Sequence, residues 1–470
     1  MLLVCKRWCR VGLENCPAWW RSVQVFGGAY SLEGPTTWGL KQKDRSEAVQ
    51  LLLLKPAILA GFTKVAPHVR QLDFSNINIE LAIGGMGALK SLVFDPMSPQ
   101  PGGVPLSYLT PLSALTQLCH LDMCLVGCHG SLPPAILPRL QCLTHLGLDF
   151  CAPTKGPPQR VSWGGDANGS ARLHVLRLCN AWLPPEEATL ASLGQLEELQ
   201  LLGDCFVPTA LPTVLHSLSG LKWLEVEETR REDNGLPQGS AEDGVSDDQW
   251  YLQLAAGCSQ LRGLRLPRGA VLGLEVPPGA LQHLSTLSID DPNRTQDLHM
   301  AGSWAKLPSL ECLQLAGLSV HGLTCATEGL TGIKRLDMGA FDLAWEHCQL
   351  SFPHLTWLAM SDGSLQSGPP PKRILRRLHH LSVHPSSIRS FARPAGLQQL
   401  PRNLSQATSL RVLDLSNCDQ VMLREVDADA LEQLKSLRRL EVNEYQRQEV
   451  MEFLRKQLPE LEIVEVELEP

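Results

Sequence analysis

Apolar residues recur along this chain in the spacing L-x-x-L-x-L, about once every two dozen residues from Val69 onward. Five consecutive middle leucines, at positions 287, 313, 336, 358 and 381, are 26, 23, 22 and 23 residues apart. A fixed period of this length indicates stacked structural repeats. The middle residues of the copies are Leu72, Leu92, Leu121, Leu146, Leu176, Leu199, Leu224, Leu264, Leu287, Leu313, Leu336, Leu358, Leu381, Leu413, Leu440 and Val464.

The L-x-L part of each copy predicts a short strand, because its apolar side chains alternate to one side. No single unit can cover its own leucines, so each must bury them against the next turn of a coil. From Val69 to Glu469 the chain resembles a leucine-rich repeat protein. The resemblance implies an α/β solenoid or horseshoe, with a parallel sheet on its concave side and short helices mixed with irregular turns on its convex side.

The remaining segments divide the chain. Residues 1–26 predict a small helical N-terminal segment, residues 27–68 a lead-in or N-terminal cap, and residues 69–470 the solenoid. An acidic insertion at residues 227–248 lengthens one repeat, and its composition predicts a solvated loop or a binding flap. Short helices are expected after Leu211 and over Glu444–Gln457, and a last strand over Leu461–Leu468.

Composition narrows the class of partner. The net charge of −8 leaves no basic excess to neutralise phosphates, so we expect no nucleic acid partner. No long apolar run predicts a membrane span or signal peptide. The 15 cysteines are an odd, scattered set, which favours reduced thiols and a cytoplasmic or nuclear location.

A second pattern lies at the N-terminus. The order V-C-K-R-W over Val4–Trp8, then W-R-x-V over Trp20–Val23, resembles the second half of an F-box. That helical module docks substrate receptors onto the Skp adaptor of a cullin-RING ubiquitin ligase. The resemblance implies an adaptor-docking remnant at Val4, Cys5, Trp8, Trp20 and Val23.

The opening L-P-x-E half of the F-box has no counterpart before Met1. We therefore expect either a start codon placed too late or a degenerate member of the family. The alternative is that these residues form only a cap over the exposed edge of the first repeat, which every solenoid end requires.

The x positions of the repeats should line the concave surface. Their acidic and basic residues are balanced, and Trp223 and Trp357 are among them. Because Trp and Arg anchor many protein interfaces, we expect partner binding there. The candidate residues are Lys222, Trp223, Arg262, Arg265, Arg335 and Trp357, with Trp223, Lys222, Arg262 and Arg265 as the best single patch. Alternatively, both Trp side chains lie flat over neighbouring strands and only cover apolar stems.

Other chemistry is weakly indicated. His120 and His145 should occupy one column on neighbouring strands, with His174 one column over, but too few further ligands accompany them for a metal site. Phosphate-loop, zinc-protease, nucleophile-elbow and dinucleotide motifs are absent. The basic run Lys372, Arg373, Arg376 and Arg377 fits a nuclear address or a solvated turn.

The sequence therefore predicts a protein that is not an enzyme, without cofactor or metal. We expect a substrate-recognition subunit of a Skp/cullin/F-box-type ubiquitin ligase, with its protein substrate on the concave face, and a monomer outside its complex. An intracellular leucine-rich repeat scaffold with no ligase link is the alternative. A catalytic or metal-dependent repeat protein is the third reading. Nothing in the sequence identifies the target, or says whether its recognition requires a phosphate or a small molecule.

Overall fold

The computed structural model describes residues 22–26, 71–75, 88–95, 104–125, 128–129, 136–150, 159–160, 172–183, 193–203, 205–208, 211–227, 229–232, 257–267, 281–290, 307–316, 331–338, 352–361, 370–384, 402–416, 431–443 and 448–466. The chain divides into two compact units, Met1–Ala241 and Glu242–Pro470. The division falls inside the acidic insertion. A single solenoid domain over residues 69–470 stays a prediction.

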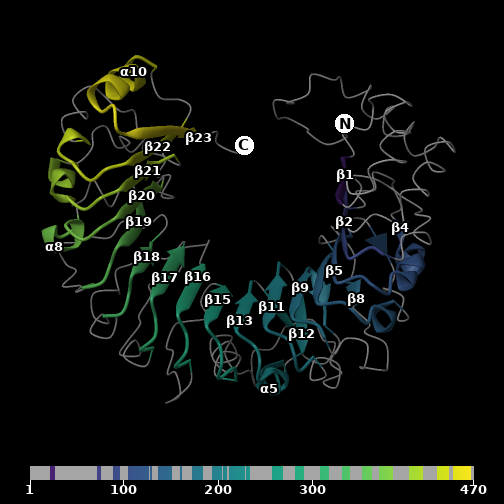
Figure 1. Ribbon diagram of the computed structural model, residues 1–470. Coiled ribbons are helices and arrows are strands. Elements are labelled where there is room, and N and C mark those ends of the chain that lie inside the picture. Colours follow the sequence, from purple (N-terminus) through teal and green to yellow (C-terminus); the bar gives the residue numbers. More distant parts are fainter. Residues whose placement is uncertain are drawn as a thin grey trace, which may run out of the picture. The chain divides into compact units, whose positions relative to one another are not determined.

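In the first unit, parallel strands pair in chain order, and each lies beside the strand of the repeat before it (Figure 1). Matching triplet positions face each other across the ladder: Leu176 pairs with Leu199, and Leu199 with Leu224. The strands are β1 (Ser22–Phe26), β2 (Gln71–Ser75), β3 (Ser91–Asp95), β5 (His120–Cys124), β7 (His145–Asp149), β9 (Val175–Cys179), β11 (Glu198–Leu202) and β13 (Trp223–Val226).

The second unit repeats this parallel ladder. Leu313 pairs with Leu336, which pairs with Leu358, which pairs with Leu381. The repeat spacing read from the sequence is therefore also the register of the sheet. The strands are β15 (Gly263–Pro267), β16 (Thr286–Asp290), β17 (Cys312–Ala316), β18 (Arg335–Asp337), β19 (Trp357–Ser361), β20 (His380–His384), β21 (Val412–Leu415), β22 (Arg439–Asn443) and β23 (Glu462–Val466). The leucine-rich repeat solenoid with a parallel sheet is confirmed.

The core of each unit is the stack of apolar triplet residues. Leu199 in the first unit and Leu381 in the second are both completely buried. A buried leucine contributes roughly 1.5–3 kcal/mol relative to an exposed one, and the stack repeats this contribution once per turn. In each unit the residues between the triplet positions therefore lie on the opposite, polar face of the sheet.

Short helices return the chain between strands, as expected. In the first unit α5 (Leu211–His216) buries Leu211, Val214 and Leu215, and 3₁₀ turns form η4 (Leu106–Ala114) and η5 (Leu137–Arg139). The second unit has α8 (Lys372–Leu375), η11 (Arg402–Gln406) and α10 (Gln448–Gln457), which confirms the helix predicted before the last strand. Figure 1 shows α8 and α10 on the side of the second unit away from its sheet.

The helical segment predicted over residues 1–26 is wrong at its end. Ser22–Phe26 forms β1, which pairs in parallel with β2 so that Val23 faces Leu72 and Val25 faces Phe74. The order Trp20-x-x-Val23-x-Val25 has the repeat spacing, which explains why this segment joins the sheet. Residues 1–21 and the predicted lead-in at 27–68 lie outside the described residues.

Part of the acidic insertion is also a strand rather than a loop. Thr229–Glu232 forms β14, the outermost strand of a second parallel sheet that the sequence analysis missed. Its other strands are β8 (Gln159–Arg160), β10 (Ala181–Trp182) and β12 (Cys205–Pro208). Cys205 and Val207 are completely buried, so a period-two alternation follows the main strand in this repeat. A further short pair joins β4 (Val104–Pro105) and β6 (Cys128–His129).

The last strand is shifted by one residue from the predicted triplet. Ile463, not Val464, faces the buried Leu440, and Val464 faces Glu441. Leu461, Ile463 and Val464 are only partly buried. Leucine spacing alone therefore does not set the register of this strand.

No disulfide joins any of the described cysteines Cys119, Cys124, Cys142, Cys179, Cys205, Cys258 and Cys312. Burial raises the pKa of Cys205 to about 11 and that of Cys258 to about 12, so both remain protonated at neutral pH. Among the described helices, none has the length and apolar character needed to cross a bilayer.

Candidate functional site

The polar face of each sheet is held rigidly by its backbone. In both units, two successive N–H groups at the x positions donate to one carbonyl of the preceding repeat: His379 and His380 both donate to the Thr356 carbonyl, at 2.8 and 3.1 Å. The side chains that start from these residues therefore have fixed positions at about 4.8 Å intervals from strand to strand.

Two of the predicted anchors meet in the second unit. The guanidinium carbon of Arg335 lies 3.8 Å from the centroid of the Trp357 ring. On the other side, His380 stacks against the same tryptophan with ring centroids 5.2 Å apart and planes 20° apart. The three residues occupy one register column on β18, β19 and β20. We call this group the Arg335–Trp357–His380 stack.

Charges on this face are sorted into two rows. At the N-terminal ends of strands β18 to β22, the two x positions before the middle leucine carry bases and no acids. The x position that follows the middle leucine carries acids and no bases. The first set, here the cation row, is Lys334, Arg335, Arg411, Arg438 and Arg439; the second, here the acid row, is Asp337, Asp414 and Glu441.

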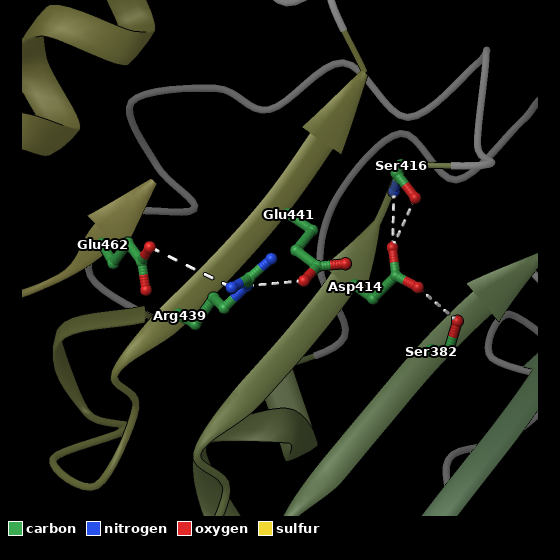
Figure 2. Close-up of polar contacts among 6 residues, drawn as sticks. All are labelled: Ser382, Asp414, Ser416, Arg439, Glu441 and Glu462. Atoms are coloured by element: carbon green, nitrogen blue, oxygen red, sulfur yellow. Dashed lines mark hydrogen bonds and ion pairs between the residues drawn. The ribbon is translucent and has the colours of Figure 1, made fainter. Parts of the chain in front are cut away.

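The acid row is built into the sheet by hydrogen bonds (Figure 2). The Asp414 carboxylate accepts from the Ser382 hydroxyl at 2.8 Å and from the Ser416 N–H and hydroxyl at 2.9 and 2.6 Å. Ser382 and Ser416 are both buried, so this carboxylate satisfies groups that water cannot reach. Figure 2 also shows Arg439 between two acids, 2.6 Å from Glu441 and 4.0 Å from Glu462.

The cation row is only partly neutralised. Lys334 pairs with Glu311 at 2.6 Å, and Arg438 with Glu460 at 3.5 Å. Arg411 is exposed, and within the described residues its guanidinium has neither a hydrogen bond nor an ion pair. The guanidinium of Arg335 lies over the Trp357 ring and has no acidic partner in the same part of the chain.

The pKa of His380 depends on its burial and on the charges of these two rows. Its pKa is lowered from the ordinary 6.5, first by burial and further by Arg335, while Asp414 and Glu441 act in the opposite direction. The imidazole in the stack is therefore neutral at pH 7, and it offers the flat face of an uncharged ring.

The first unit presents a different polar face. His120 and His145 lie opposite each other in the register, as predicted, with ring centroids 5.5 Å apart. His174 lies 3.8 Å from Glu197, which also pairs with Lys222 at 2.8 Å. The hydrogen bond with Lys222 is the main reason that the pKa of Glu197 is lowered.

Burial lowers the pKa of His145, and the nearby His120 and His174 lower it further. Within the described residues, no group of three or more His, Cys, Asp or Glu side chains is placed to hold a metal ion.

The other predicted anchors are not brought together by observed contacts. Lys222 and Trp223 lie in the first unit, and the indole N–H of Trp223 is buried without a hydrogen-bond partner in the described residues. Arg262 and Arg265 lie at β15 in the second unit, the former exposed and the latter partly buried. The patch that combines all four residues stays a prediction.

The adaptor-docking residues Val4, Cys5, Trp8 and Trp20 lie outside the described residues, and Val23 lies on β1. The basic run from Lys372 to Arg377 begins in α8 and continues past its end. Lys372, Arg373, Arg376 and Arg377 are all exposed.

The sequence places Arg411 and Asp414 among the polar x positions without distinguishing them from the other charged residues there, and it indicates His380 only as a neighbour of His379 on one strand. The signal was available: each lies at a fixed offset from a middle leucine, so aligning the repeats on Leu336, Leu358, Leu381 and Leu413 reproduces both rows.

No family model and no curated protein matches the sequence. The structure is similar to a leucine-rich repeat protein of Leptospira interrogans, LIC12759, with 20% identity and a TM-score of 0.44 over 86% of this chain and 98% of that one.

An internalin of Listeria monocytogenes, inlF, gives 14% identity and a TM-score of 0.33 over 90% and 94% of the two chains. The protein of the TLR13–ssRNA13 complex gives 16% and 0.37 over 87% and 52%. The fold assignment therefore rests on the strand ladders described above.

Proposed function

We propose that this chain is a non-catalytic receptor that binds a protein partner on the polar face of its leucine-rich repeat sheet. The observation that carries this proposal is the Arg335–Trp357–His380 stack, which places an aromatic anchor and an arginine on a rigid parallel ladder. Trp and Arg contribute disproportionately to protein interfaces, and a repeat sheet offers them over an extended surface. The absence of sequence motifs for phosphate, zinc-protease or acyl-transfer chemistry agrees with a binding role.

The more specific form of the proposal is a substrate-recognition subunit of a Skp/cullin/F-box-type ubiquitin ligase. Its support is the V-C-K-R-W order over Val4–Trp8, which resembles an F-box. The second half of that resemblance is weakened, because Ser22 and Val23 belong to β1 rather than to a helix. In this form the target occupies the polar face and the N-terminal segment holds the adaptor, in the cytoplasm or nucleus.

The competing form is a leucine-rich repeat scaffold without a ligase link. The pairing of β1 with β2 favours it, because Ser22 and Val23, the last two residues of the W-R-x-V segment, belong to the repeat sheet. A pull-down of the full chain, with any in-frame upstream codons included, by the purified Skp adaptor separates the two forms. Binding that is lost in Trp8→Ala supports the ligase form, and no binding leaves the scaffold.

Site-specific photo-crosslinking tests the receptor role itself. A photoreactive residue replaces Gln200 or Gln314 on the polar faces, or His216 or Arg376 on the helical side of the repeats. We expect partner crosslinks from the first pair and none from the second. Equal crosslinking from both sides, or crosslinks from the helical side alone, would overturn the proposal.

A further inference from the structure

The polar face of the second unit has an arrangement that its fold does not need. The leucine ladder fixes only the buried positions, yet over strands β18 to β22 the bases and acids on the other face are segregated into two rows. Mixed charges would neutralise each other at less electrostatic cost, since like charges on neighbouring strands repel. The segregation therefore indicates an outside group that compensates the cation row.

Two residues of the cation row lack an acidic partner in the described part of the chain. Lys334, Arg438 and Arg439 each have an acidic partner, at 2.6, 3.5 and 2.6 Å respectively. Arg335 and Arg411 have none within the residues the structure describes. Trp357 and His380 lie between them, on β19 and β20, and their stacked rings form the flat part of the surface.

Strand spacing sets the distance between the two arginines. Arg335 is the first residue of β18, and Arg411 directly precedes β21. Three strand spacings separate β18 from β21, or about 14 Å. An extended peptide laid across the strands advances about 3.4 Å per residue, so about four residues span the gap. The stacked rings lie under the middle of such a segment.

We propose that this surface binds an extended acidic segment of a partner protein, with carboxylates at positions i and i+4 and an apolar side chain at i+2. Arg335 and Arg411 each take one carboxylate, and the apolar side chain packs on Trp357 and His380. The acid row, about two residues farther along the strands, repels a carboxylate displaced in that direction and fixes the register of the segment. This inference rests on the receptor role proposed above and names the chemistry of the partner.

The test uses the full chain and a fluorescein-labelled peptide with two glutamates four residues apart and a leucine midway, followed by fluorescence anisotropy. We expect binding that weakens as salt rises, because the contacts are charged and exposed. Trp357→Ala and Arg411→Glu should each lower the affinity at least tenfold. Arg376→Glu, on the helical side, makes the same change in net charge and should alter it less than twofold.

Two probe controls complete the design. A peptide with lysines in place of the glutamates should not bind, and one with its two glutamates adjacent should bind at least fivefold more weakly. A phosphoserine peptide of the same spacing, if it binds tighter than the glutamate peptide, still supports the anionic spacing and identifies phosphate as the preferred group.

The results that would reject the acidic segment differ from those that would reject the receptor role. The inference fails if the wild-type chain does not bind the glutamate peptide, or if Trp357→Ala and Arg411→Glu bind it as well as wild type. If Gln200 and Gln314 still crosslink a partner while the peptide is not bound, the receptor role stands and the acidic segment is rejected. Trp357 and Arg411 project from the polar face, so unchanged thermal melting curves serve as the folding control.

Discussion

The polar faces of the two units differ although their buried ladders are alike. On the first, Lys222 pairs with Glu197 at 2.8 Å, and Gln200 donates to Glu198 at 2.8 Å. On the second, Arg411 has no acidic partner among the described residues, and Arg335 has only the ring of Trp357. Each face has an exposed arginine without a hydrogen bond or ion pair in the described residues, Arg177 on the first and Arg411 on the second, and the second face sets the stacked rings of Trp357 and His380 beside it.

This difference shows which positions the fold controls. A triplet leucine is buried in either unit, so a substitution there lowers the free energy of unfolding. The x positions are less restricted, because most need only a side chain that tolerates a strand, although Asp414 also holds Ser382 of the neighbouring repeat. The two units therefore differ at the x positions while their buried ladders agree, and the proposed binding specificity would be set there.

The largest expected effect tests the ladder that both units share. Leu199→Asp in the first unit and Leu381→Asp in the second should each destabilise their own unit by about 3 kcal/mol or more, because burial is lost and a carboxylate is left without water. Hydrogen exchange resolved by residue measures the effect. Gln314→Asp, on the polar face, is the control and should cost less than about 0.5 kcal/mol. Exchange rates in the mutated unit that match wild type would contradict a repeat core.

A smaller effect separates the acid row from the ion pairs of the first unit. Asp414→Ala should cost about 2 kcal/mol, since the buried Ser382 hydroxyl and the Ser416 N–H lose their acceptor. Glu197→Ala removes an exposed carboxylate and should leave the denaturation midpoint unchanged. Chemical denaturation of both variants measures the difference. Equal midpoints would mean that the acid row is not structurally required.

The turn after β11 is particular to the first unit. Gly203 has φ of +62°, and a Cβ there would meet the side-chain amide oxygen of Asn180. Gly203→Ala should therefore cost about 1 kcal/mol. Gly194→Ala, where a Cβ meets nothing within 4 Å, is the matched control and should be neutral. A neutral Gly203→Ala in thermal melting would show that the turn relaxes without cost.

The smallest effect concerns pH. Burial is the first cause of the lowered pKa of both His145 and His380, so the unfolded chain binds more protons than the folded one just below pH 6.5. Stability should therefore fall as the pH drops through this window, and His380→Gln should flatten the decline.

Histidine NMR titration sharpens the comparison: Arg335→Ala should raise the pKa of His380 and leave that of His145 unchanged. A shift in both would mean that the effect is not local to the stack.

The sequence by itself determined the repeat spacing, the buried leucines and most of the register. These follow from local alternation, because a residue's place in L-x-x-L-x-L decides whether it faces the core or the polar face. The prediction of Arg335 and Trp357 as polar-face residues was therefore sound. The helix over Glu444–Gln457 was also readable, since its amphipathic pattern lies within one short segment.

Only the tertiary structure decided which residues join a ladder where the pattern is faint. Ser22–Phe26 and Thr229–Glu232 become strands because a neighbouring strand offers its free N–H and C=O groups. In the same way, pairing with β22 places Ile463, not the Val464 of the triplet, opposite Leu440. Charge rows, stacked rings and unpaired arginines arise between repeats some two dozen residues apart, and strand pairing alone brings them together.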